Sequence, residues 1–113
     1  MAGEHDELPL SITAEALASW RAGAAPPQVL DVREAWELQI CRFPDSLDIP
    51  LGELTQRCAE VPTDRPVVVI CHHGVRSMHA TQYLRASGWP RTTNLTGGID
   101  AYARRVEPQM AVY

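Results

Sequence analysis

The residues of this chain that could do chemistry are concentrated in one segment, where a run of β-branched residues meets a cysteine. The run is 66–70 (PVVVI), and it is followed by Cys71, two histidines, a glycine and Arg76. A thiolate is the nucleophilic form of cysteine, and positive charge and backbone N–H groups nearby favour it over the thiol. Cys71 is therefore the candidate nucleophile of the chain.

Three features of the segment after Cys71 favour a thiolate. A helix is predicted to begin at residue 75, and its N-terminus presents unpaired N–H groups and about half a positive elementary charge. Successive amides of a tight loop can point inward as an anion-binding nest, and Arg76 adds a full positive charge. Gly74 has no Cβ and allows the positive φ that a tight turn needs. The predicted anion-binding segment comprises His72, His73, Gly74, Val75, Arg76 and Ser77.

The two loop histidines have two open interpretations. His72 and His73 are either polar loop residues with exposed rings or groups that attract an anionic substrate when protonated. A metal site made from Cys71 and these histidines is not expected, because adjacent residues in a tight loop diverge and no distal pair of ligands has suitable spacing. His79, on the predicted helix that follows, is expected to face solvent.

Short apolar runs alternate with helix-like segments along the chain, which predicts an α/β domain with a mostly parallel sheet and helices on both faces. The predicted strands are 8–10, 28–32, 46–49, 66–70 and 92–95. The predicted helices are 14–21 with Thr13 as its N-cap, 34–38, 51–61, 75–87 and a last one between Gly97–Gly98 and Pro108. Ligands of such sheets bind beyond the carboxyl ends of the strands, which is where Cys71 falls.

Length and charge narrow the class of protein. A chain of 113 residues with 45% hydrophobic residues fits one domain, so a single domain over 1–113 is expected, with a flexible N-terminus at 1–7 and a C-terminal tail at 107–113. The net charge of -4 argues against a nucleic-acid partner, because backbone binding needs a basic surface. All ten basic residues are arginine, which excludes a Schiff-base or phosphate-loop lysine.

The cysteines and the hydropathy pattern bear on the compartment. Three cysteines without an export signal indicate free thiols in a reducing cytoplasm rather than disulfides. Cys58 falls in the apolar stripe of the predicted 51–61 helix and is expected to be a small buried hydrophobe. No stretch approaches the roughly 18 apolar residues of a membrane span, so no membrane partner is expected.

Four segments, spread over nearly the whole chain, resemble the rhodanese (thiosulfate sulfurtransferase) family in their order and spacing. They are 30–34 (LDVRE), Phe43-Pro44 with Ile49-Pro50, the six-residue loop 71–76, and 95–99 (LTGGI). The chain departs from the family pattern at Arg42, where the family usually has His, and at Asp45, where it usually has Gly. No role is therefore transferred to that segment. Tyr102 replaces a frequent Trp, without an expected effect on function.

The resemblance implies one rhodanese-like domain with a sheet of about five strands, and a sulfurtransferase that needs no cofactor. Cys71 would take the outer sulfur of thiosulfate or a similar donor, carry it as a persulfide and pass it to cyanide in an assay or to a cellular thiol. The expected partners are thus a small anionic sulfur donor and a thiol or cyanide acceptor, with a sulfur-relay protein as a further candidate. Asp31 and Arg33 are expected to be structural, pairing with each other or tying down the loop.

Two alternatives stay open on the same fold. The active-site loops of cysteine phosphatases and arsenate reductases have five residues between a Cys and an Arg. In this chain four residues separate Cys71 from Arg76, and Ser77 occupies the position where a phosphatase needs Arg. The smaller ring of amides suits a single sulfur better than a tetrahedral oxyanion. The second alternative is a non-catalytic rhodanese-like module, a scaffold or sensor, although such modules often lack the loop cysteine.

Overall fold

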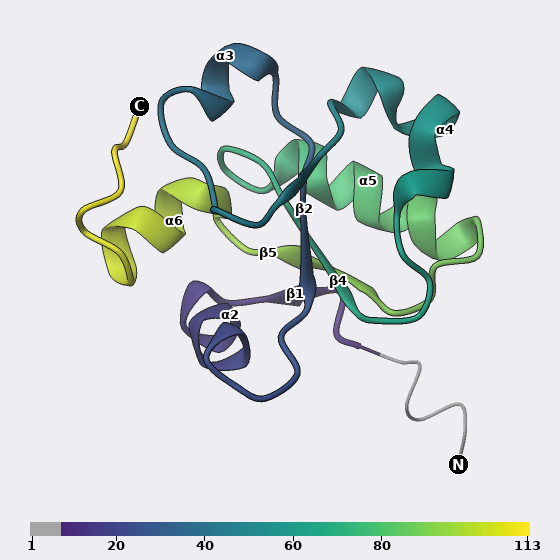
Figure 1. Cartoon of the computed structure of the whole chain (residues 1–113), viewed down its shortest axis with the longest axis horizontal. Coiled ribbons are helices and arrows are strands. Elements are labelled where there is room, and N and C mark those ends of the chain that lie inside the picture. The colour runs from purple at the N-terminus through teal and green to yellow at the C-terminus, as the bar shows by residue number, and fades with distance from the viewer. Residues whose placement is uncertain (1–7) are drawn as a thin grey trace.

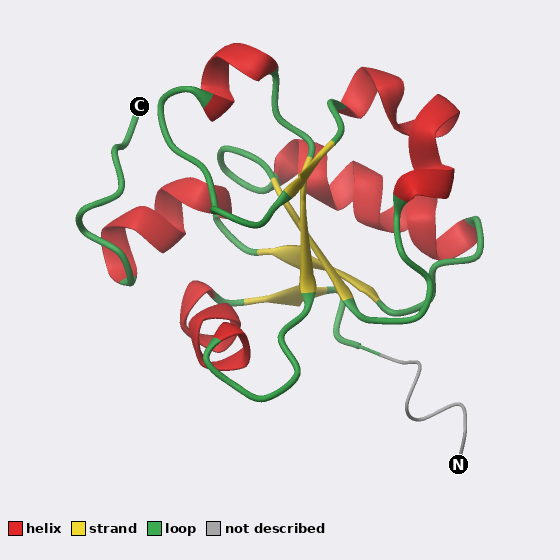
Figure 2. Cartoon of the chain, viewed as in Figure 1, coloured by secondary structure: helices red, strands yellow, loops and turns green. Residues whose placement is uncertain are grey.

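A five-stranded parallel sheet forms the centre of the molecule in the computed structural model, which describes residues 8–113 (Figures 1 and 2). The strand order is β1-β5-β4-β2-β3, and every neighbouring pair is parallel. The strands are β1 (Ser11–Ile12), β2 (Gln28–Asp31), β3 (Leu47–Asp48), β4 (Val67–Ile70) and β5 (Thr92–Leu95). The predicted α/β class and the number of strands are confirmed.

Helices cover both faces of the sheet, as predicted (Figure 1). On one face lie α2 (Ala14–Arg21) and α6 (Gly98–Arg105), which pack against each other. On the other lie α5 (Val75–Ala86) and α4 (Leu54–Arg57), the latter flanked by the 3₁₀ turns η1 (Leu51–Glu53) and η2 (Cys58–Glu60). The short helix α3 (Ala35–Leu38) follows β2. Parallel strands need such crossovers, which place helices on the sheet faces.

The strand β4 is buried on both faces, which explains its run of four apolar residues. Val67 and Val69 pack on the side of Leu84 in α5, whereas Val68 and Ile70 pack on the side of α2 and α6. Burying one such side chain stabilises the fold by about 1.5–3 kcal/mol. This central strand is therefore a rigid support for the residue that follows it, Cys71.

The predicted first strand, at 8–10, is wrong. The strand β1 begins at Ser11, because Pro9 has no N–H to donate to a neighbouring strand. Instead the carbonyl of Pro9 accepts hydrogen bonds from the side chains of Arg85 and Thr93, at 3.0 and 2.6 Å. The next prediction is confirmed: Thr13 caps α2, its hydroxyl accepting from the amide of Ala16 at 3.1 Å.

The predicted continuous helix at 51–61 is also wrong, because the segment forms three short pieces. The backbone leaves the α region at Arg57, whose φ is -116° and ψ 10°, and i→i+3 bonding takes over, with the amide of Val61 donating to the carbonyl of Cys58 at 2.9 Å. Cys58 therefore turns partly away from the core and is half-buried rather than buried.

Two further expectations concern the termini and the membrane. The predicted flexible N-terminus, 1–7, lies outside the described residues. None of the helices within 8–113 combines the length and the apolarity needed to cross a membrane.

Candidate active site at the carboxyl end of β4

Cys71 directly follows β4 at its carboxyl end and begins the loop of residues 71–77, which leads into α5. Figure 1 shows this connection between β4 and α5. Cys71 is only 1% exposed. The Sγ atom accepts hydrogen bonds from the amides of Gly74 at 3.1 Å and Ser77 at 3.3 Å, and the Ser77 hydroxyl lies at 3.3 Å. Two of the amides predicted to surround the sulfur thus point at it, and one of them, the amide of Ser77, belongs to the first turn of α5.

Glycines shape this loop from two sides. Gly74 has a φ of 103°, as its predicted role requires, and a Cβ there would lie 3.2 Å from the amide nitrogen of Gly97. Gly98 has a φ of 64°, and a Cβ there would overlap the carbonyl oxygens of Cys71 and His72. The double-glycine turn therefore brings α6 into direct backbone contact with the loop.

The N-terminus of α6 holds the loop carbonyls. The amide of Ile99 donates to the carbonyl of Cys71 at 2.8 Å, and that of Asp100 donates to the carbonyl of His72 at 3.1 Å. Unpaired N–H groups at the start of a helix are natural donors for such carbonyls. Because the carbonyls are bound on this side, the amides of Gly74 and Ser77 are left for the sulfur.

Ser77 is fully buried, and its hydroxyl lies between the sulfur of Cys71 and the side chain of Asn94. It donates in a short hydrogen bond to Oδ1 of Asn94 in β5, and the Nδ2 of Asn94 in turn donates to the Ser11 hydroxyl at 3.2 Å. With its one proton given to Asn94, the hydroxyl can accept from the thiol of Cys71, and it can donate to a thiolate only when it releases Asn94. Sequence reasoning missed Asn94, although an amide side chain within a predicted buried strand needs a partner and was a usable signal.

Arg76 does not present a free positive charge, which corrects the expectation from the sequence. Its guanidinium donates to both carboxylate oxygens of Glu37, at 2.7 and 2.9 Å. Glu37 is 2% exposed, and the hydrogen bonds from Arg76 lower the pKa of its carboxyl to about 2 against the effect of burial. The group beside the loop is therefore an ion pair.

Glu37 was also missed, although its spacing offered a signal. Glu34 and Glu37 form a capping box at the start of α3, in which the carboxylate of Glu37 accepts from the amide of Glu34 at 3.0 Å. The contact between α3 and Arg76, 39 residues along the chain, exists only in the folded molecule.

Asp31 and Arg33 pair with each other, as predicted. Both are fully buried, and the closest approach of guanidinium and carboxylate is 2.7 Å. Burial lowers the pKa of Arg33, but the hydrogen bonds to Asp31 and to the Tyr113 hydroxyl raise it overall, so the guanidinium stays charged. Arg33 also donates to the carbonyl of Cys41 at 2.8 Å. The pair thus braces the connection from β2 through α3.

The outer face of the 71–77 loop is formed by His72, His73 and Val75. His73 and Val75 are exposed, with the His73 side chain 62% exposed, and His72 is half-buried. The rings of His72 and His73 stack with centroids 3.9 Å apart, so the expectation that these neighbours diverge is wrong. His79 faces solvent, as predicted.

The nearest arrangement to a metal site joins both histidines to Asp100, with ligand atoms within 4.8 Å of one another. Asp100 already accepts from Arg104 at 3.0 and 3.1 Å, and the Nε2 of His72 lies 2.8 Å from the carbonyl oxygen of Tyr113. Two of these three residues therefore already have hydrogen-bond partners.

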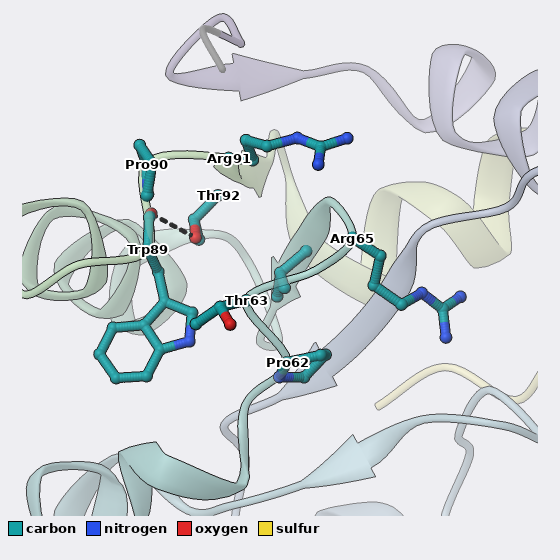
Figure 3. Close-up of a pocket in the computed structure, with 8 residues that line it drawn as sticks. Pro62, Thr63, Arg65, Trp89, Pro90, Arg91 and Thr92 are labelled. Carbon is teal, nitrogen blue, oxygen red and sulfur yellow. Dashed lines mark hydrogen bonds between the residues drawn. The ribbon is translucent and has the colours of Figure 1, made fainter. Parts of the chain in front are cut away.

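A separate hollow lies at the amino ends of β4 and β5, opposite the end that carries Cys71 (Figure 3). Its walls include Pro62, Thr63 and Trp89, and the Thr92 hydroxyl there donates to the carbonyl of Trp89 at 2.8 Å. The cavity volume is about 10 Å³, room for one water at most. It does not compete with the Cys71 loop as a candidate site.

Comparison with known proteins agrees with the geometry. Residues 13–105 match the family described as Rhodanese-like domain. A sulfurtransferase from Allochromatium vinosum is 37% identical over 100 residues, which cover 88% of this chain and 94% of that protein. The uncharacterized protein YqhL of Bacillus subtilis is 38% identical over 88 residues, 78% of this chain and 70% of that one. The crystal structure of a rhodanese-related protein from Thermoplasma volcanium has a TM-score of 0.79 and 33% identity, covering 88% of this chain and 96% of the other. The chain therefore belongs to the rhodanese-like family of sulfurtransferases.

Proposed function

We propose that this chain transfers sulfane sulfur through a persulfide on Cys71. The observation that carries the proposal is the buried thiol of Cys71, which accepts hydrogen bonds from the amide of Gly74 in the loop and from the amide of Ser77 in the first turn of α5. Hydrogen bonds to a charged group contribute about 1.5–3 kcal/mol each. Two such donors stabilise an anionic sulfur without any cofactor.

The proposed reaction has two half-reactions. The Cys71 thiolate attacks the outer sulfur of thiosulfate or a similar donor, a new S–S bond forms, and the bond to the leaving sulfite breaks with its electron pair. A nucleophile, cyanide in an assay or a cellular thiol, then attacks the terminal sulfur and returns Cys71 to the thiolate. Dividing the transfer in this way is the usual advantage of nucleophilic catalysis.

Two features support sulfur chemistry over phosphate chemistry. Four residues rather than five separate Cys71 from Arg76, so the ring of loop amides is smaller than one that encircles a phosphate and suits a single sulfur better. Ser77, which occupies the place of a phosphatase arginine, is buried against the sulfur and bound to Asn94. A phosphatase or arsenate reductase, or a non-catalytic module, would have to use this loop differently.

The test is mass spectrometry of the protein after incubation with thiosulfate. The parent should gain the mass of one sulfur atom, which cyanide removes. The Cys71→Ser variant should gain nothing, and Cys41→Ser and Cys58→Ser should behave as the parent does. A sulfur found on Cys41 or Cys58 would refute the assignment, and Cys71-dependent hydrolysis of an aryl phosphate without any sulfur gain would favour the phosphatase alternative.

The compartment and the biological partners are part of the same proposal. Free thiols and a reducible persulfide suit the cytoplasm, where the donor is a small anionic sulfur compound or a sulfur-relay protein and the acceptor is a thiol. Incubating the persulfide form with thiols of increasing size would identify the class of acceptor.

A further inference from the structure

We propose that Tyr113 is a specificity-determining residue, whose ring covers the mouth of the 71–77 loop and limits the size of the acceptor that reaches Cys71. The inference rests on the proposed persulfide chemistry of Cys71, but its structural part can be tested without that chemistry. It assigns a role to the tail, residues 107–113, which the sequence left without one.

The ring of Tyr113 lies flat on the residue that follows the nucleophile. Its centroid is 3.8 Å from that of His72, with 5° between the planes, and its carbonyl oxygen is 2.8 Å from the Nε2 of His72. The edge of Trp36 in α3 contacts the same ring, with centroids 6.0 Å apart at 74°. Figure 1 shows the end of the tail beside α3. Aromatic contacts of this kind contribute about 0.5–1.5 kcal/mol each.

The hydroxyl of Tyr113 is held by the two charged groups that support the site. It accepts from Nη1 of Arg33 at 3.0 Å and donates to Oε2 of Glu37 at 2.6 Å. Glu37 is the residue that holds Arg76. Burial raises the pKa of this hydroxyl to about 12, so it remains a donor to Glu37 at physiological pH. One side chain thus joins the loop histidine to both ion pairs.

The rest of the tail is lightly held. Five of its residues are exposed, and only Met110 and Tyr113 pack partly against the core. A groove of about 380 Å³ lies between the tail and residues 40–42. Segments with few buried contacts open locally at low free-energy cost. Tyr113 is accordingly the residue that anchors the tail, and the tail can detach from the loop without unfolding of the domain.

The consequence is a dependence on acceptor size. Cys71 is 1% exposed in the structure, in which the Tyr113 ring is stacked on the neighbouring His72. A two-atom nucleophile such as cyanide needs far less space to reach it than a tripeptide thiol does. The rate with a bulky acceptor is then scaled by the fraction of molecules in which the tail is lifted. Removing the ring raises that fraction.

The experiment compares two acceptors on the persulfide-loaded protein. Tyr113→Ala should raise the rate with glutathione relative to the rate with cyanide by about tenfold, the change that accompanies loss of about 1.4 kcal/mol of closure. Tyr113→Phe keeps the stack and loses the hydroxyl bonds, so its ratio should lie between those of the parent and Tyr113→Ala. Val112→Ala, an exposed neighbour, is the matched control and should leave the ratio unchanged. Equal changes with both acceptors in the Tyr113 variants would show a merely structural role and overturn the proposal.

Alkylation separates failure of this proposal from failure of the proposed function. In a background with Cys41→Ser and Cys58→Ser, Tyr113→Ala should accelerate labelling of Cys71 by N-ethylmaleimide more than labelling by the smaller iodoacetamide. If that size dependence appears while thiosulfate loads no sulfur, the role proposed for Tyr113 is supported and the proposed sulfur transfer is refuted. If Cys71 takes up sulfur and no size dependence appears, the role proposed for Tyr113 is refuted. Circular dichroism checks that Tyr113→Ala is folded, and Tyr113→Phe gives the deciding comparison if it is not.

Discussion

The ion pair of Asp31 and Arg33, at the carboxyl end of β2, and the ion pair that Arg57 of α4 forms with Glu53 have nearly the same geometry in opposite surroundings. Arg33 lies 2.7 Å from Asp31 with both side chains fully buried. Arg57 lies 2.8 Å from Glu53, with side chains 36% and 53% exposed. The Arg76–Glu37 pair is intermediate, also at 2.7 Å, with side chains 35% and 3% exposed. The distances are too similar to rank the contributions of these pairs to stability, so the ranking depends on how deeply each pair is buried.

Burial changes what the loss of one partner does. An exposed pair exchanges its partner for water and salt ions, so its removal changes little. A buried pair leaves an uncompensated charge in a medium of low dielectric constant, and removal of one partner costs about 3–5 kcal/mol. Arg33 and Arg76 are thus structural groups held by buried carboxylates, whereas Arg57 on α4 is a surface group.

The largest expected effect is that of Arg33→Met. The variant leaves the Asp31 carboxylate buried without its guanidinium and removes the donor to the Tyr113 hydroxyl, so the free energy of unfolding should fall by about 3–5 kcal/mol. Urea denaturation measures it. The double variant Asp31→Leu with Arg33→Met should recover part of the loss, and a double variant as unstable as the single one would contradict this explanation.

Glu37→Gln should have the next largest effect, this time on activity. The amide keeps the shape but loses the charge that orients Arg76, so kcat/KM for sulfur transfer should drop about tenfold, or about 1.4 kcal/mol. Glu37 acts through Arg76 and is a positioning residue, so kcat should change more than KM for cyanide. An unchanged kcat would show that the ion pair does not position the loop.

The pH dependence of stability sharpens the same comparison. The folded-state pKa of Glu37 is about 2, below its ordinary value of 4.5, so its contribution is present above pH 4.5 and is lost as the pH falls toward 2. The parent should lose more stability across that interval than Glu37→Gln does. Thermal melts at a series of pH values measure it, and parallel curves for the two proteins would refute the assignment.

The smallest expected effect is that of Arg57→Ala. Arg57 pairs with Glu53 and Glu60 on the exposed face of α4, where water replaces either partner. The melting temperature should stay within experimental error of the parent. A loss comparable to that of Arg33→Met would break the distinction between buried and exposed pairs.

The elements predicted correctly from the sequence are those determined by residues within or next to them. The β-branched run before Cys71, the cap at Thr13 and the glycines of the last turn each lie within a few residues of what they determine, and each prediction was confirmed. The errors at 8–10 and 51–61 have local causes too, in the missing N–H of Pro9 and the backbone at Arg57. Such details decide boundaries and leave the α/β order intact.

The sequence by itself determined that a cysteine follows a buried central strand and precedes a helix, because hydrophobic burial and helix capping act over short stretches of chain. Only the tertiary structure decided which groups surround that cysteine. Glu37 meets Arg76 across 39 residues and Tyr113 meets His72 across 41. No residue pattern within one segment specifies such contacts, since they form only when the sheet brings the ends of different elements to one edge. The charge of the loop and its cover are for that reason properties of the fold.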